Sequence, residues 1–253
     1  MLGRTLTDAE NGQNLLCLFD GFLLRRVNQL VTVPAGGQRL VALLGLVGPR
    51  SRLVAAATLW PDASDDRAHG NLRSSLWRLK RLCPGLVCAH GDHLAIDSSV
   101  ALDTAMFVAC TRAIVRDREP LTDYADAVAM VGVRELLPGW YDDWVVDERE
   151  RLRLLALNAL ERLSSRLVAD GMFALAMEAA LEAVHAEPLR ESAHRALIAV
   201  HLAQGNVGEA RRHFARLTEL LRRELDVAPS HLAADLLQRL QSRRPAGGGL
   251  HVV

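Results

Sequence analysis

A short series of segments in the first hundred residues constrains the fold of this chain more than any other feature. An apolar segment at 52–59 follows Ser51 and ends before Pro61; a basic segment at 66–82 comes next, and two apolar runs then flank Gly91-Asp92. Serine is a preferred helix cap, proline stops a helix, and apolar runs on both sides of a Gly-Asp turn are typical of a β-hairpin. Helix, turn, helix and hairpin in this order predict a winged helix-turn-helix. The first helix is expected to bury Leu53, Val54, Ala57 and Leu59.

The basic segment combines the spacing of a helix with an unbalanced charge. The chain has 30 basic and 30 acidic residues, yet this segment carries five cations and no acid after Asp66. Leucines recur at steps of four, three and three residues, which is the spacing of one helix face. They are Leu72, Leu76, Leu79 and Leu82. A second face carries Arg67, Asn71, Ser74, Arg78 and Arg81. The pattern fits either an ordinary solvated amphipathic helix or a DNA recognition helix, which buries one face and offers its cations to an anionic partner.

The residues before this unit predict a small antiparallel sheet followed by one helix. Three β-prone runs are separated by Asp20-Gly21 and by a polar stretch; the runs are 15–19, 22–24 and 30–33. Pro34-Ala-Gly-Gly then leads into an apolar helix expected at 38–47. Its expected inward residues are Leu40, Val41, Leu43, Leu44 and Val47.

The order LFDGFLL, LVTVPAGGQRLVALLGLV, ATLWPDAS, LRSSLWRLKRL and GDHLAID resembles the OmpR-type winged helix at the front of the Streptomyces antibiotic regulatory protein family. By this resemblance, the positions facing base edges are Arg78 and Lys80, with Ser74 beside them and Asn71 able to contact base or phosphate. The candidate phosphate contacts are Arg67, Arg73, Arg81, Arg52 and His93. His93 is equally well explained as an exposed turn residue with no role.

Gly70 is the residue that fits the recognition helix least. Glycine inside a helix costs about 1 kcal/mol relative to alanine. Either the helix begins after this residue, or the backbone approaches another molecule closely at this point.

From Asp103 onward the pattern is helical to about residue 241, with helices expected at 103–116 and 124–136. The segment LLPGWYDDWVVDERERL places a Pro-Gly turn and several acids before a long helix, and acids at that end suit the helix dipole without a ligand. The same segment resembles a recurrent signature, LLPGxxxxWxxxERxRL, of the bacterial transcriptional activation domain.

The last third of the chain repeats itself. Gly171 and Gly205 are 34 residues apart, and small or apolar residues recur at the same offset. The matching pairs are Ala169 with Ala203, Ala176 with Ala210, and Leu163 with Leu197; Pro188 and Pro229 each close a unit. A period of about 34 residues with glycine between two helices is typical of tetratricopeptide-like repeats, whose concave face usually binds proteins.

The predicted architecture is an α+β winged helix-turn-helix domain followed by an all-α, tetratricopeptide-like domain. The boundaries are a disordered tail at 1–13, the winged helix at 14–102, the helical domain at 103–241 and a Gly-rich disordered tail at 242–253. The arrangement resembles a small Streptomyces antibiotic regulatory protein. Such a protein is a transcriptional activator of a secondary-metabolite (antibiotic) cluster. It binds direct repeats in double-stranded promoter DNA, self-associates on that DNA, and contacts RNA polymerase holoenzyme including its sigma factor.

The alternative from the residues is a protein-interaction adaptor whose winged helix does not read DNA, which the overall neutral charge favours slightly. Enzyme chemistry has no support. Lys80 is the only lysine and lies in no P-loop, no HExxH or GxSxG motif occurs, and His194 with His201 lacks a further metal ligand. No cofactor or metal is expected. The four scattered cysteines are expected to be reduced, and no segment reads as a membrane span or signal peptide, so we expect a cytoplasmic protein without membrane contact.

Overall fold

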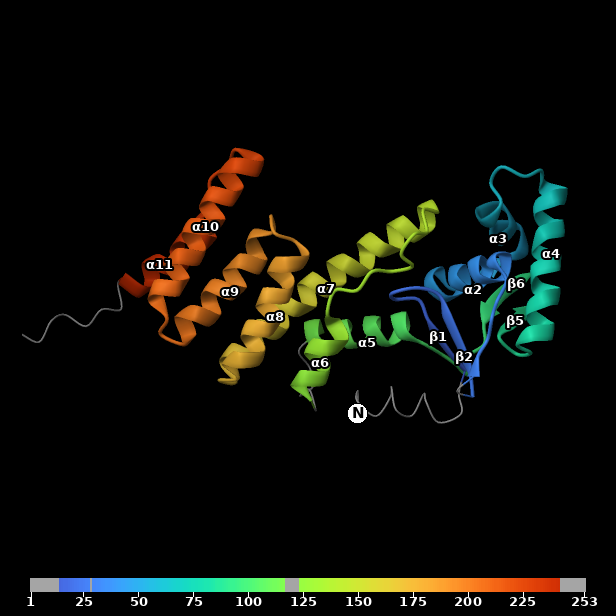
Figure 1. The fold of residues 1–253 in the computed structure, drawn as a ribbon, viewed down its shortest axis with the longest axis horizontal. Coiled ribbons are helices and arrows are strands. Elements are labelled where there is room, and N and C mark those ends of the chain that lie inside the picture. The colour runs from blue at the N-terminus through green and yellow to red at the C-terminus, as the bar shows by residue number, and fades with distance from the viewer. Residues whose placement is uncertain (1–13, 28, 117–122, 242–253) are drawn as a thin grey trace, which may run out of the picture. The chain divides into compact units, whose positions relative to one another are not determined.

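The computed structural model describes residues 14–27, 29–116 and 123–241. The predicted tails at 1–13 and 242–253 lie outside the described residues. The chain forms two compact units (Figure 1). The first comprises Met1–Met130 and Arg134–Leu155, and the second comprises Val131–Val133 and Ala156–Val253.

The predicted N-terminal sheet is present and has one additional strand. Strands β1 (Asn14–Cys17), β2 (Leu23–Arg26), β3 (Gln29–Leu30) and β7 (Val100–Leu102) have the order β3-β2-β1-β7. β1 and β2 are antiparallel, with Leu16 opposite Leu24, and both of these leucines are buried. β7 pairs with β1 in parallel, across more than 80 residues of sequence. The sheet therefore ties the end of the winged helix to its beginning.

Helix α2 (Ala35–Val47) lies between this sheet and helix α4 (Asp65–Leu82), and glycines permit both contacts. A Cβ atom on Gly37 would lie 3.2 Å from Leu79, and one on Gly45 would lie 3.0 Å from Leu102 of β7. The helix begins three residues earlier than expected because Pro34, in an extended conformation, already serves as its N-cap. Leu40, Val41, Leu43 and Leu44 are buried as predicted, while Val47 is only half-buried.

The helix-turn-helix and hairpin follow as predicted. Strand β4 (Arg50–Ser51) leads into α3 (Arg52–Leu59), then α4 (Asp65–Leu82) and the hairpin β5 (Val87–His90) and β6 (His93–Ile96). The Ser51 hydroxyl accepts a hydrogen bond from the Val54 N–H at 3.2 Å, which is the predicted cap. β4, β6 and β5 form a second sheet, and His90 opposes His93 across a two-residue turn, tighter than the sequence suggested.

The expected inward face of α3 is partly wrong. Leu53 and Val54 are 59% and 46% exposed, and Ala57 is also exposed; the buried residues are Ala55, Ala56 and Leu59. The first turn of α3 lies at the tip of the hairpin, where the Arg52 N–H donates to the Asp92 carbonyl at 2.9 Å. The side chains of Leu53 and Val54 in this turn therefore lie outside the core.

The first unit continues beyond the predicted boundary at residue 102. Helix α5 (Asp103–Arg116) has the expected bounds, but α6 (Tyr124–Val131) ends five residues before the expected Leu136. The chain after α6 is extended because it pairs with the end of β1: Leu136 bridges Phe19, and the Leu137 N–H donates to the Leu18 carbonyl at 2.9 Å. The boundary between compact units therefore does not coincide with the predicted domain boundary.

The second unit has the predicted helical repeat. Its elements are the later part of α7 (Asp143–Ala169), then α8 (Phe173–Ala186), α9 (Glu191–Ala203), α10 (Val207–Leu225) and α11 (His231–Gln241). Gly171 and Gly205 occupy equivalent turns between helices, with φ of 74° and 77°. Ala176 and Ala210 are fully buried at equivalent positions. The 34-residue offset therefore marks real structural equivalence.

Candidate nucleic-acid interface

Helix α4 presents one face to the core and the other to solvent. Its buried residues recur at steps of four, three and four: Ala68, Leu72, Ser75 and Leu79. Asp65 and Asp66 in the first turn, and Lys80 and Arg81 in the last, match the helix dipole at each end. The predicted apolar face is only partly correct, since Leu76 is half-buried and Leu82 is 41% exposed. Leu82 lies near the end of the helix and outside the core stripe.

The predicted polar face points outward. Arg67, Ser74, Arg78 and Arg81 are exposed, and Asn71 is half-buried. This exposure agrees with the helical spacing of these residues in the sequence.

The cations of α4 have no acidic partner in the part of the chain that the structure describes. Among the described residues, the salt bridges include none of the five cations of α4 and not Arg52. In α10 of the second unit, by contrast, Arg212 pairs with Glu209 and Arg222 with Glu219. Unpaired cations along one helix make a local positive surface on a neutral chain, which is the electrostatic footprint of a polyanion site.

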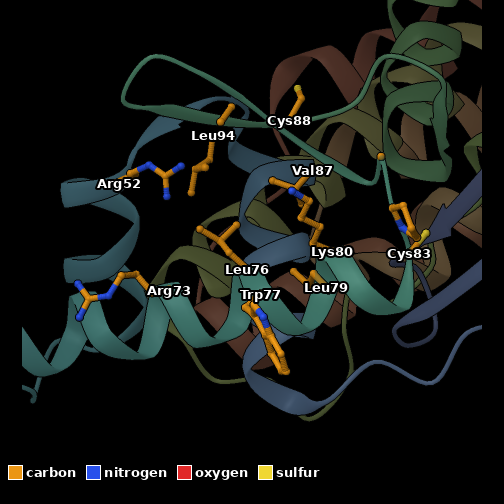
Figure 2. A pocket seen from close by; sticks show the side chains of 13 residues that line it. Arg52, Arg73, Leu76, Trp77, Leu79, Lys80, Cys83, Val87, Cys88 and Leu94 are labelled. Carbon is orange, nitrogen blue, oxygen red and sulfur yellow. The ribbon is translucent and has the colours of Figure 1, made fainter.

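Three of the predicted contact residues lie around one cavity between α4 and the hairpin (Figure 2). Arg52, Arg73 and Lys80 line this cavity of about 470 Å³, together with apolar residues that include Leu76, Val87 and Leu94. Lys80 is two residues from Arg78, a rotation of about 200° around a helix with 3.6 residues per turn. Lys80 therefore lies on a different side of α4 from Arg78, and it lines the same cavity as Arg73 and Arg52. The sequence analysis had placed Lys80 and Arg78 together at the base edges.

A second cavity of about 630 Å³ lies beside the first turns of α4. Arg67 and Asn71 line it from α4, Arg39 lines it from α2, and Tyr141 lines it from the segment before α7. Arg39 also forms an ion pair with Asp142. The first turns of α4 thus adjoin the segment that resembles the activation-domain signature.

His93 lies at the tip of the hairpin and is exposed. It pairs with Ser51 across the second sheet, so it adjoins the start of α3. His90, which the sequence analysis did not single out, lies opposite His93 and is also exposed. The pairing of the strands could have indicated it, because a two-residue turn places the flanking residues side by side.

Gly70 lies within α4, which begins at Asp65, so the helix does not start after it. A Cβ atom at this position would meet only a guanidinium nitrogen of Arg73, at 3.8 Å. No contact among the described residues therefore requires glycine here.

Arg149 holds the conformation of the LLPG segment before α7. Its guanidinium donates to three backbone carbonyls: those of Leu136 and Leu137, each at 3.0 Å, and that of Trp140, at 3.1 Å. The turn it holds is tight, with positive φ at Leu137 and Gly139. The arginine of the ER pair in LLPGxxxxWxxxERxRL is thus the residue that fixes the LLPG turn.

One further contact joins the same segment to the connection between β1 and β2. The rings of Phe22 and Trp140 stack with centroids 6.5 Å apart.

Asp103, at the start of α5, accepts hydrogen bonds at 3.0 Å from the N–H groups of Leu18 and Phe19. Burial raises the pKa of this carboxyl, against the opposing effect of its N–H donors.

Two buried histidines of the second unit contact each other. His194 Nδ1 lies 2.8 Å from His213 Nε2, and His194 Nε2 lies 2.8 Å from the Pro188 carbonyl oxygen. The two rings come from α9 and α10, which cross here. No group of three metal-binding side chains occurs among residues 14–27, 29–116 and 123–241.

All four cysteines are free thiols, and burial raises the pKa of the Cys110 thiol to about 11. Within the part of the chain that the structure describes, no helix is both long and apolar enough to cross a membrane.

Comparison with known proteins agrees with this architecture. A solved structure, Mycobacterium tuberculosis EmbR in complex with a low-affinity phosphopeptide, is similar to this chain with a TM-score of 0.72 and 15% sequence identity. The similarity covers 93% of this chain and 66% of the EmbR chain, so this chain spans about two thirds of that protein's length. At this identity the likeness establishes the fold. No curated protein matches the chain.

The family model described as bacterial transcriptional activator domain matches residues 111–241, just over half of the chain. This range contains the Arg149-anchored turn and the helical repeat. The family is one of transcription regulators. The chain therefore belongs to the bacterial transcriptional activator domain family.

Proposed function

We propose that this transcriptional activator binds promoter DNA sequence-specifically, with α4 in the major groove and the β5–β6 hairpin against the neighbouring backbone or minor groove. The observation that carries the proposal is the row of unpaired, outward-facing cations on α4. Cations that lack internal partners are free to neutralise phosphates and release counterions.

The proposed contacts fall into two groups. Ser74, Arg78 and Asn71 face the base edges, where arginine forms bidentate hydrogen bonds to guanine. The phosphate contacts are Arg67, Arg73, Arg81, Arg52 and His93. Lys80, expected at a base edge, shares its cavity with Arg73 and Arg52, and this neighbourhood supports a phosphate contact instead.

We propose that the second unit contacts RNA polymerase holoenzyme, including its sigma factor, and that two or more protomers occupy direct repeats in the promoter. The regulated genes are proposed to be a secondary-metabolite (antibiotic) cluster, and the protein to act in the cytoplasm. Family membership and the resemblance of the N-terminal motifs support these assignments.

The first experiment is a gel-shift with promoter fragments from the protein's own gene neighbourhood, followed by footprinting of the shifted fragments. We expect a sequence-dependent shift over two adjacent repeats. Absence of any sequence-dependent shift at low salt would contradict the proposal and favour the adaptor function.

Two variants then separate base contacts from phosphate contacts. Arg78→Ala should cost about 1–3 kcal/mol of binding free energy on the best site and relax the preference at one base pair. Arg73→Ala should weaken binding to every duplex alike and reduce the salt slope by about one. Both are measured by anisotropy titrations at several salt concentrations. Identical specificity and identical salt slopes for the two variants would contradict the assignment.

A further inference from the structure

Trp77 is the largest apolar side chain that α4 exposes. Its indole is 59% exposed, whereas Leu72 and Leu79 of the same helix are buried. Figure 2 shows the ring leaving α4 on the side away from Leu94 and Val87 of the hairpin. Within the described part of the chain the indole N–H forms no hydrogen bond, and the ring adds little to the core. The ring is therefore available for contact with a molecule that α4 binds.

The surroundings of Trp77 indicate the charge of that partner. The Arg81 guanidinium carbon lies 4.8 Å from the ring centroid, a cation–π contact one helical turn away. Arg73 and Lys80 lie about one helical turn before and after Trp77, at i−4 and i+3. None of these three cations takes part in the salt bridges found among the described residues. An apolar ring among unpaired cations suits a surface with anionic edges and an apolar group between them.

The major groove of DNA has this chemistry. Phosphates run along its edges, and thymine presents its C5-methyl group, to which apolar side chains pack. Ser74, Arg78 and Arg81 lie within one turn of Trp77 on the outward side of α4, so the ring approaches the bases that these residues are proposed to face.

We propose that Trp77 packs against the C5-methyl group of a thymine in the operator, and that Arg81 holds the indole in the orientation for this contact. The inference rests on the DNA-binding function proposed above. It adds a base preference to that function: each bound half-site contains a thymine whose methyl group is required.

The test uses the full-length protein and a duplex enriched from a random pool by the wild type. Each thymine of the enriched site is replaced in turn by deoxyuridine, which lacks only the methyl group. We expect one thymine per half-site at which replacement lowers wild-type affinity about four-fold, the factor that burial of one methyl group supplies. Trp77→Ala should lose at least this factor on the unmodified duplex and should no longer respond to the replacement.

Two control variants sharpen the comparison. Trp77→Phe keeps an aromatic surface and should retain part of the methyl effect. Leu82→Ala removes the other exposed apolar side chain of α4 and should retain all of it. Because Trp77 and Leu82 are exposed, thermal melts of both alanine variants should match the wild type.

The outcomes separate the two proposals. If the wild type enriches no sequence, the DNA-binding function itself is wrong. If a sequence is enriched but no thymine shows the loss, or the loss persists in Trp77→Ala, the Trp77 contact is wrong. The exposed indole would then fit an acidic protein partner.

Discussion

At the scale of single residues, Gly70 gives a prediction in which stability and binding change in opposite directions. It lies inside α4, and a Cβ atom there would meet only the Arg73 guanidinium at 3.8 Å. Gly70→Ala should therefore raise the free energy of unfolding by about 0.5–1 kcal/mol, because alanine loses less backbone entropy in a helix. If α4 lies in the major groove with its backbone close to DNA at this point, the same change should weaken DNA binding. Urea unfolding and anisotropy titrations measure the two effects.

Gly208 is the matched control. It lies in the first turn of α10, and a Cβ atom there would likewise meet only one guanidinium nitrogen, of Arg212 at 3.9 Å. Gly208→Ala should stabilise the protein and leave DNA binding unchanged. Unchanged DNA affinity in Gly70→Ala as well would show that Gly70 has no part in the interface.

Single residues also show where sequence reasoning stops. The helix spacing identified Leu72 and Leu79 as core residues, but it could not place Leu53 or Trp77, because which neighbours cover a helix is decided by tertiary packing. The outward set of cations on α4 was predictable, since it depends only on helical period. The separation of Lys80 from Arg78 could have been read from the same period.

At the scale of elements, the Arg149 turn gives a stability prediction. The guanidinium donates to three carbonyls between α6 and α7. Its removal takes a charged donor from all three, and the Leu137 carbonyl keeps only the hydrogen bond from the Trp140 N–H at 3.1 Å. Arg149→Ala should lower the free energy of unfolding by about 2–3 kcal/mol, as loss of a charged hydrogen-bond donor does. Trp140 and Trp144 lie beside the turn, so tryptophan fluorescence during urea unfolding is the appropriate probe.

Arg151 provides the comparison for Arg149. It forms an i,i+3 ion pair with Glu148 on the surface of the same helix, and its side chain is 44% exposed. Arg151→Ala should change stability by less than about 0.5 kcal/mol, because such pairs contribute little in water. Equal losses in the two variants would mean that the carbonyl contacts of Arg149 do not hold the turn.

The elements themselves were predictable to different degrees. α3, α4, α5 and the hairpin follow from local signals, namely the Ser51 cap, the helical period and the Gly-Asp turn. The parallel pairing of β7 with β1 and the extended segment around Leu136 are long-range. No local pattern specifies a partner more than 80 residues away. The helix predicted from the sequence therefore continued to Leu136, where the structure instead forms a β-bridge to Phe19.

At the scale of the whole molecule, two buried histidines of the second unit give a pH prediction. A chain of hydrogen bonds fixes neutral tautomers for its buried histidines. The His194 Nε2–H donates to the Pro188 carbonyl, and the His213 Nε2–H donates to His194 Nδ1. His213 Nδ1 then faces the Arg216 guanidinium at 3.3 Å as an acceptor.

A proton added to His213 Nδ1 would meet the Arg216 cation. Burial, with the nearby His194 and Arg216, accordingly lowers the pKa of His213 to about 4, while burial also lowers the pKa of His194. The sequence could show His194 and His201 on one helix, but the partner of His194 comes from the crossing of α9 and α10.

The sign of the pH effect follows from the uptake of protons on unfolding. In the unfolded chain a histidine titrates near 6.5, so between pH 6.5 and 4 the unfolded state binds more protons than the folded state. Stability is therefore fully present above pH 6.5 and declines as pH falls toward 4, with a total loss of about 3 kcal/mol from His213. In thermal melts followed by circular dichroism between pH 4.5 and 7.5, the unfolding transition should move to lower temperature on acidification. His213→Gln should weaken this dependence. His185→Gln, at an exposed histidine of α8, should leave it intact, and an unchanged pH dependence in His213→Gln would contradict the assignment.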